Sequence, residues 1–138
     1  MSEDFLIDTN IISEISRKNP NPDVVSFIAN QQKISVSTIL FHELTFGLET
    51  ADHARKSQLT QFLLAMRRRF GAQAIPVDLE IAETAGRLRA FEKKQGRILT
   101  LADALMAATA MVRGKTLVTR NIRDFANLGI KLKNPFSE

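Results

Sequence analysis

Short apolar runs alternate along the chain with longer segments whose apolar residues recur at helical spacing. Four of these runs predict β-strands, because they are apolar or alternate with a period of two and end at polar or turn residues. They are residues 5–7, 34–37, 74–77 and 116–118. Pro76 has no backbone donor, so the third of these strands is expected at a sheet edge.

Helical spacing and capping residues predict six helices between the strands. Asn21 and Asp78 are expected as N-caps, the first because Pro22 follows it in the position that proline favours. The predicted helices are residues 11–15, residues 22 to about 30, the segment after Ser37 that carries Leu40, Leu44 and Leu48, residues 51–70, the segment from Asp78 to Gly96, and residues 100–110.

The segment 51–70 is the longest predicted helix, and its apolar side has more than one interpretation. With the preceding helix it could form a hairpin that stands away from the sheet. Its apolar side could then contact a second copy of the chain or another protein, and an ordinary core face explains it equally well. The residues on this side are Leu59, Phe62, Leu63 and Met66.

The alternation of strands and helices predicts an α/β fold. We expect a mainly parallel sheet of about four to five strands, covered by helices on both faces. A length of 138 residues is usual for one domain, and the chain has neither an internal repeat nor a Gly/Ser-rich linker. Residues 1–138 are therefore expected to form a single domain.

Composition limits the cellular compartments and the kinds of functional site that are expected for this chain. No apolar run approaches the roughly 18 residues that a membrane span needs, and the acidic N-terminus is unlike a signal peptide, so a cytoplasmic protein is expected. The chain has no cysteine, which excludes disulfides, thiolate metal sites and a cysteine nucleophile. With only His42 and His53, a histidine-based zinc site is not expected either.

The net charge of +4 and the sequence pI of about 9.8 suit a polyanionic partner, because binding to phosphates releases counterions. A solvated helix face explains the clusters at 67–69 and 93–94 better when each is taken alone. The charge permits nucleic-acid binding without establishing it. The basic clusters are Arg67 to Arg69, Arg87 with Arg89, Lys93 with Lys94, and Arg120 with Arg123.

Three acids are candidate site residues because each lies near the carboxyl end of a predicted strand or the start of a predicted helix. Asp8 directly follows the first apolar run, although taken alone it is better explained as a helix cap. Glu43 lies one residue off the apolar stripe of its helix, where an exposed glutamate is commonplace. Asp103 has capping-box spacing from Thr100, and the helix dipole there also favours an ionised metal ligand.

A fourth polar group, residues 119–124, follows the strand 116–118. In a parallel sheet these residues and the three acids would converge near one edge. Carboxylates at close range raise one another's pKa, and a hard divalent cation relieves this through oxygen ligands. Mg²⁺ is expected, with Mn²⁺ as a possible substitute.

These motifs resemble those of PIN-domain ribonucleases, and more narrowly of VapC-type toxins from bacterial toxin–antitoxin pairs. The resemblance spans nearly the whole chain. It rests on residues 6–10, on Ser37 with Glu43, Leu44 and Gly47, on residues 101–103 with the alanine-rich helix after them, and on residues 118–121 with Asp124 and Phe125.

The resemblance implies an Mg²⁺-dependent endoribonuclease in which Asp8, Glu43 and Asp103 bind the metal. Many relatives have an acid where this chain has Asn121, so Asp124 could complete the catalytic set or only close a cap. The expected reaction is phosphodiester hydrolysis by metal-activated water. The residues expected to orient water and phosphate are Asn10, Thr119 and Asn121, and those that could hold the RNA backbone are Arg120 and Arg123.

The resemblance also implies partners: an RNA substrate, a small cognate antitoxin whose tail covers the acidic site, and a second copy in a homodimer. Two alternatives remain open at this point. The first is a PIN-like nuclease that acts on DNA. The second is a binding module whose acids are structural and which binds nucleic acid without cutting it.

Overall fold

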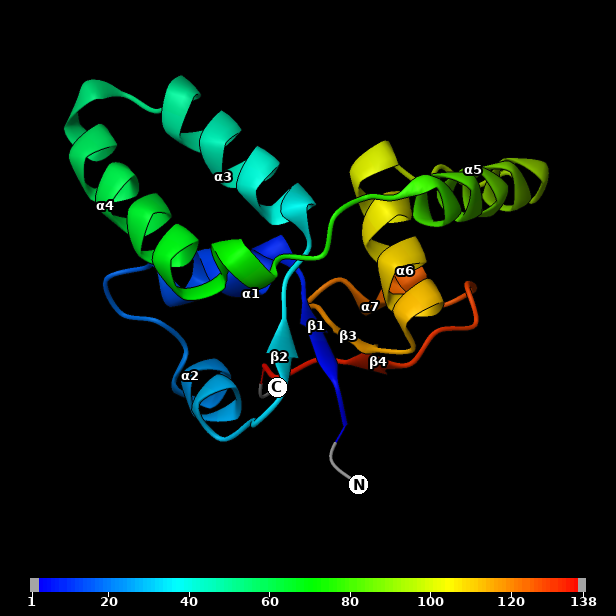
Figure 1. The fold of residues 1–138 in the computed structure, drawn as a ribbon, viewed down its shortest axis with the longest axis horizontal. Coiled ribbons are helices and arrows are strands. Elements are labelled where there is room, and N and C mark those ends of the chain that lie inside the picture. Colours follow the sequence, from blue (N-terminus) through cyan, green and yellow to red (C-terminus); the bar gives the residue numbers. More distant parts are fainter. Residues whose placement is uncertain (1–2, 137–138) are drawn as a thin grey trace.

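The computed structural model describes residues 3–136, and its helices surround a small central sheet (Figure 1). Most predicted elements are present, with a four-residue helix and a terminal strand in addition. In chain order they are β1 (Phe5–Ile7), α1 (Thr9–Ile15), α2 (Pro22–Ala29), β2 (Ile34–Ser35), α3 (Thr38–Thr50), α4 (His53–Phe70), the 3₁₀ turn η1 (Gly71–Gln73), α5 (Leu79–Lys94), α6 (Leu101–Arg113), β3 (Thr116–Val118), α7 (Ile122–Phe125) and β4 (Leu132–Lys133).

All four strands are parallel, in the order β2-β1-β3-β4, which confirms the predicted mainly parallel sheet. β1 and β3 pair at the centre, with Leu6 opposite Leu117. Strand β4 was not predicted, because its two residues, Leu132 and Lys133, are too short a run to show a period. Strand β4 covers the edge of β3 that would otherwise be unpaired.

The strand predicted at residues 74–77 is wrong. Ile75 makes only an isolated parallel bridge with Ser37. The pairing stops because Ser37 already caps α3, accepting a hydrogen bond from the backbone N–H of Ile39, while Pro76 has no N–H to continue a ladder. For the same reason β2 ends at Ser35 rather than at the predicted Ser37.

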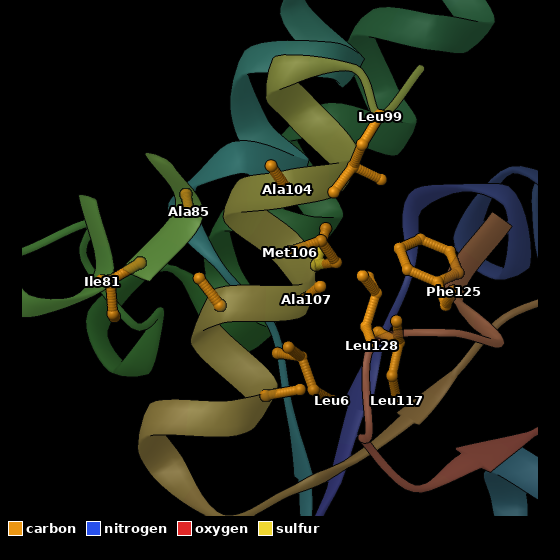
Figure 2. Packing of buried hydrophobic residues seen from close by; sticks show 12 residues of the cluster. Leu6, Ile81, Ala85, Leu99, Ala104, Met106, Ala107, Leu117, Phe125 and Leu128 are labelled. Atoms are coloured by element: carbon orange, nitrogen blue, oxygen red, sulfur yellow. The ribbon is translucent and has the colours of Figure 1, made fainter. Parts of the chain in front are cut away.

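The strands bury both faces, which confirms the prediction of helices on each side. Phe5 and Ile7 point into one cluster, formed with α1, α2 and the end of α4. Leu6 points into the other, with α5, α6 and α7. Figure 2 shows this second cluster, to which Ala104 and Ala107 of α6 belong together with Leu6 and Leu117. Small side chains allow this close approach of helix to sheet.

Helices α3 and α4 form the predicted hairpin, but α4 does not stand wholly clear of the sheet (Figure 1). Its last residue, Phe70, is buried, and Phe62 and Met66 pack against the same cluster. For these residues the core interpretation of the apolar side is therefore the right one. Among the described residues, none of the helices is both long and apolar enough to cross a membrane.

Candidate active site

Asp8 and Thr119 lie side by side at the carboxyl ends of the two central strands. The backbone N–H of Asp8 donates to the carbonyl of Val118 at 2.9 Å, which extends the β1–β3 pairing by one residue. From β1 the chain crosses to β2 on one side of the sheet, while β3 lies on the other side. Such a point, where the connections diverge, is where open parallel sheets place their ligands.

Hydrogen bonds fix the Asp8 carboxylate from several directions. Oδ2 accepts from the Thr119 hydroxyl at 2.7 Å and from the Asn10 amide at 3.3 Å. Oδ1 accepts from the backbone N–H of Thr9 at 2.8 Å, so Asp8 is also the cap of α1. The cap interpretation of Asp8 is confirmed, and Oδ2, which takes no part in the cap, has its own partners at the edge of the sheet.

Thr119 and Asn10 link this carboxylate to the segment that follows β3. The Thr119 hydroxyl accepts from the backbone N–H of Asn121 at 3.1 Å. The Asn10 carbonyl oxygen accepts from the backbone N–H of Arg120 at 3.3 Å. The start of α1 and the loop after β3 are therefore held together by the side chains that surround Asp8.

Two further acids reach the same pocket from other elements. Glu43, on α3, accepts a hydrogen bond from the Thr9 hydroxyl. Asp103 lies in the first turn of α6, where its backbone N–H donates to the Thr100 hydroxyl at 3.2 Å. The pocket has a volume of about 1160 Å³. It is lined by Asp8, Asn10, Glu43, Asp103 and Asn121, with other residues of α1, α3 and α4.

Burial and like charge make an ionised carboxylate costly here. Burial raises the pKa of Asp8 to about 6, against the lowering effect of its hydrogen bonds from Thr119 and Thr9, and the charges of Asp103 and Glu43 raise it further. The pKa of Asp103 is also raised, mainly by burial and then by the charges of Asp124 and Glu43. Nearby positive charge would relieve both costs.

The donor set fits Mg²⁺ or Mn²⁺, because the pocket offers carboxylate, amide and hydroxyl oxygens. Within residues 3–136, no three Asp, Glu, His or Cys side chains are gathered closely enough to hold one ion. Mg²⁺ does not need such a cage. It keeps several waters and is typically bound through one or two carboxylates together with substrate phosphates.

Not every residue predicted for the site faces this pocket. Thr119 is fully buried beneath it, and Asp124 and Arg120 are not among the residues that line it. The Arg120 guanidinium instead lies 4.3 Å from the centre of the Phe136 ring. Asn121 precedes α7 as expected, but its side chain makes no capping hydrogen bond.

The structure adds basic residues that the sequence reasoning did not select. Arg17, Lys18 and Arg55 line the pocket that contains the acids. Helical spacing does not indicate Arg17, because it lies two residues beyond Ile15, the last residue of α1. No local sequence pattern indicates that Arg55 lines the pocket, because its position depends on α4 folding back along α3.

Comparisons with known proteins agree with this architecture. A family model described as PIN domain matches residues 5–131. The chain is 29% identical to a VapC ribonuclease, Y4jK, from Sinorhizobium fredii, with 96% of this chain and 97% of the relative covered. The crystal structure of FitAcB from Neisseria gonorrhoeae is similar with a TM-score of 0.85 at 29% identity, over 95% of this chain and 97% of that one. A toxin–antitoxin complex from Klebsiella pneumoniae contains a chain similar with a TM-score of 0.69 at 27% identity, covering 96% and 98%.

Proposed function

This chain belongs to the PIN-domain family, and on that premise we propose that it is a metal-dependent endoribonuclease that acts as the toxin of a toxin–antitoxin pair. The observation that carries the proposal is the buried Asp8 carboxylate at the junction of β1 and β3, in one pocket with Glu43 and Asp103. The name of the Sinorhizobium relative, a VapC ribonuclease, supports RNA as the substrate.

Asp8, Glu43 and Asp103 are the carboxylates among which the metal would bind, one or two of them directly and the rest through water. When bound, Mg²⁺ or Mn²⁺ supplies the positive charge that acidifies an attacking water and offsets the charge growing on the phosphate. The protein's part is to hold the carboxylates in place. Thr119 and Asn10 fix the orientation of Asp8, and Thr9 fixes that of Glu43.

Asn121, in the loop after β3, also contributes a polar side chain to the pocket. Its backbone is fixed by the hydrogen bond to Thr119, and its amide is not engaged in capping α7. The amide can therefore donate to a phosphate oxygen or accept from a water at the mouth of the pocket. We assign Asn121 to positioning the substrate, and no covalent nucleophile is needed.

A small antitoxin protein is the proposed partner. The support is the similarity to a chain in the Klebsiella toxin–antitoxin complex. A tail that covers the acidic pocket would place a basic side chain among the carboxylates, because that lowers the cost of their burial. Expression of the wild-type chain should arrest growth of a bacterial host, and expression of Asp103→Asn should not.

The central experiment compares cleavage of an RNA and a DNA of the same sequence by the purified chain. Both are incubated in chelator and in increasing Mg²⁺ or Mn²⁺, and the products are resolved on a sequencing gel. We expect cuts in RNA only, dependent on metal, and absent in Asp103→Asn. The matched control is Asp23→Asn, which removes an exposed acid on α2 and should leave cleavage unchanged.

The same experiment separates the alternatives. Equal cutting of the DNA would indicate a nuclease without a requirement for the 2′-hydroxyl. Binding of RNA in chelator with no products at any metal concentration would indicate a non-catalytic binding module. Full activity of Asp103→Asn would remove the acidic pocket from the mechanism.

A further inference from the structure

The pocket that holds the acids also has a basic side, formed by Arg17, Lys18 and Arg55. Helix α1 runs between the two. Asp8 caps its N-terminal end, and Arg17 lies two residues beyond its last residue, Ile15. We call Arg17, Lys18 and Arg55 the basic rim. Neither the proposed reaction nor the comparisons assign a role to these residues.

The Arg17 side chain is oriented by a hydrogen bond to Glu14. Its guanidinium donates to Glu14 Oε1 at 3.3 Å, and Glu14 is itself buried, with Oε2 accepting from the backbone N–H of Asn21 at 2.8 Å. The Arg17 side chain nevertheless remains 67% exposed. A guanidinium carries five N–H donors, so the ones not used on Glu14 are free to bind a ligand.

Arg55 comes to the rim from a different element. It lies in the first turn of α4, and Gln58 and Gln61, farther along the same helix, line the pocket with it. The next residue, Lys56, is equally exposed but does not line the pocket. Helix geometry points neighbouring side chains in different directions, so these two adjacent cations provide a natural matched pair.

We propose that the basic rim binds backbone phosphates of the RNA strand a few nucleotides from the bond that is cut. The inference rests on the proposed function and deepens it by naming the residues that hold the flanking strand. The separation follows from α1, whose 7 residues span about 10 Å between the acids and the rim. A strand that follows α1 from the acids to the rim therefore crosses more than one nucleotide.

Charge explains why such a rim is needed. A polyanionic strand approaching three carboxylates is repelled, and cations in the same pocket offset that repulsion before the reaction begins. Arginine suits phosphate because its planar fork can bind two oxygens at once. These contacts are to the backbone, so they position the strand without selecting its sequence.

The first test measures binding in chelator, where no cleavage interferes. The probe is a mixed-sequence single-stranded RNA with a fluorescent end, titrated with wild type, Arg55→Gln, Lys56→Gln and the triple variant Arg17→Gln/Lys18→Gln/Arg55→Gln. We expect the triple variant to lower the slope of log Kd against log salt by about 2, at roughly 0.7 for each lost phosphate contact. Lys56→Gln should behave like wild type.

The second test uses cleavage kinetics and substrate length. Because the rim binds the strand away from the reacting bond, the triple variant should raise KM and leave kcat unchanged. Once the cut is mapped, the RNA is shortened from each side in turn. On the side that reaches the rim, the difference between wild type and the triple variant should vanish once the remaining nucleotides are too few to span the length of α1.

The outcomes separate this inference from the proposed function. If wild type cuts RNA while the triple variant keeps its salt slope, KM and melting temperature, the rim does not bind RNA and the inference falls alone. An effect of the rim confined to binding of a protein antitoxin would overturn it equally. If the triple variant has a lower melting temperature than wild type, the single variants Arg55→Gln and Lys56→Gln are compared instead. Equal salt slopes for these two variants overturn the inference. Failure of wild type to cut any RNA would instead contradict the proposed function.

Discussion

Asp8 caps α1, and in the proposed function the same side chain is also a metal ligand. Its Oδ1 satisfies a free N–H at the start of α1, and its Oδ2 receives the Thr119 hydroxyl from the neighbouring strand. Burial raises the pKa of this carboxyl to about 6. Keeping the Asp8 carboxyl ionised at neutral pH therefore lowers the stability of the metal-free protein.

We predict that Asp8→Asn abolishes RNA cleavage and stabilises the metal-free protein. A rise from 3.8 to about 6 corresponds to about 3 kcal/mol at pH 7. Loss of one hydrogen bond with Thr119 lowers the free energy of unfolding by about 1 kcal/mol, so the net increase in that free energy is about 2 kcal/mol. Urea unfolding in chelator measures it. A variant that unfolds at lower urea than wild type would show that burial of this charge is not the dominant cost.

The residues Asn121 and Asp124 pose a different question, namely which of them supports the metal. The amide of Asn121 lines the pocket but carries no charge, whereas Asp124 lies outside the lining and still raises the pKa of Asp103 through its charge. Electrostatic attraction for a cation extends beyond direct contact, so Asp124 can favour binding through a bridging water.

We predict that Asp124→Asn raises the Mg²⁺ concentration needed for half-maximal cleavage and that Asn121→Asp lowers it. The first removes a charge near the site, and the second adds one to the lining. Cleavage rates over a range of Mg²⁺ concentrations, with melting temperatures of both variants, check this. If Asp124→Asn changes only the melting temperature, Asp124 has a structural role and the site has three acids.

At the scale of elements, the connection between α5 and α6 determines where α6, the helix that carries Asp103, begins. Glu92, near the end of α5, is 3% exposed, and its two oxygens accept from Arg97 Nε and Nη2 at 2.9 Å each. The backbone N–H of Arg97 also donates to the carbonyl of Glu92 at 2.9 Å. This doubly bonded pair ties the connection back onto α5, three residues before the cap of α6 at Thr100.

We predict that Glu92→Gln lowers the melting temperature at neutral pH and that the difference disappears in acid. The hydrogen bonds from Arg97 hold the pKa of Glu92 below its usual range in the folded state. A carboxyl with a lowered pKa contributes stability above its unfolded pKa and loses it as the pH falls through the folded value. Melting curves from pH 7 to below 4 test this, with the exposed Glu80→Gln as control. A difference that stays constant with pH would contradict it.

For the molecule as a whole, the sequence was most informative where one element carries its own signal. The apolar runs at 5–7 and 116–118 are the two central strands, and Asn21, Asp78 and Thr100 are caps as predicted. A buried parallel strand and a helix cap are local patterns, so the chain shows them without its tertiary structure.

The sequence was least informative where tertiary context decides. Strand β4 exists because β3 offers it an edge, and residues 74–77 fail to form a strand because their partner turns into α3. The basic rim was missed for the same reason, since Arg17 and Arg55 line one pocket only in the folded chain. Arg120 does not line the pocket, because its guanidinium lies over the ring of Phe136, and its contact with RNA stays a prediction.

Oligomeric state is the remaining prediction at this scale. The sequence suggested a homodimer through Leu59, Phe62 and Leu63, but Phe62 packs against the core and all three are at most half-exposed. Phe46, Leu79, Ile98 and Leu101 are instead the large apolar side chains more than half exposed, from 58% to 96%.

We predict that the isolated chain sediments as a homodimer. Exposed apolar side chains of this size lower the free energy when a second surface covers them, and the family resemblance implies a dimer. Sedimentation velocity over a range of concentrations measures the mass of the species in solution. Because the expected contact is apolar, raising the salt concentration should not dissociate the dimer, whereas it should weaken RNA binding by the basic rim. A species of monomer mass at high micromolar concentration would contradict the prediction.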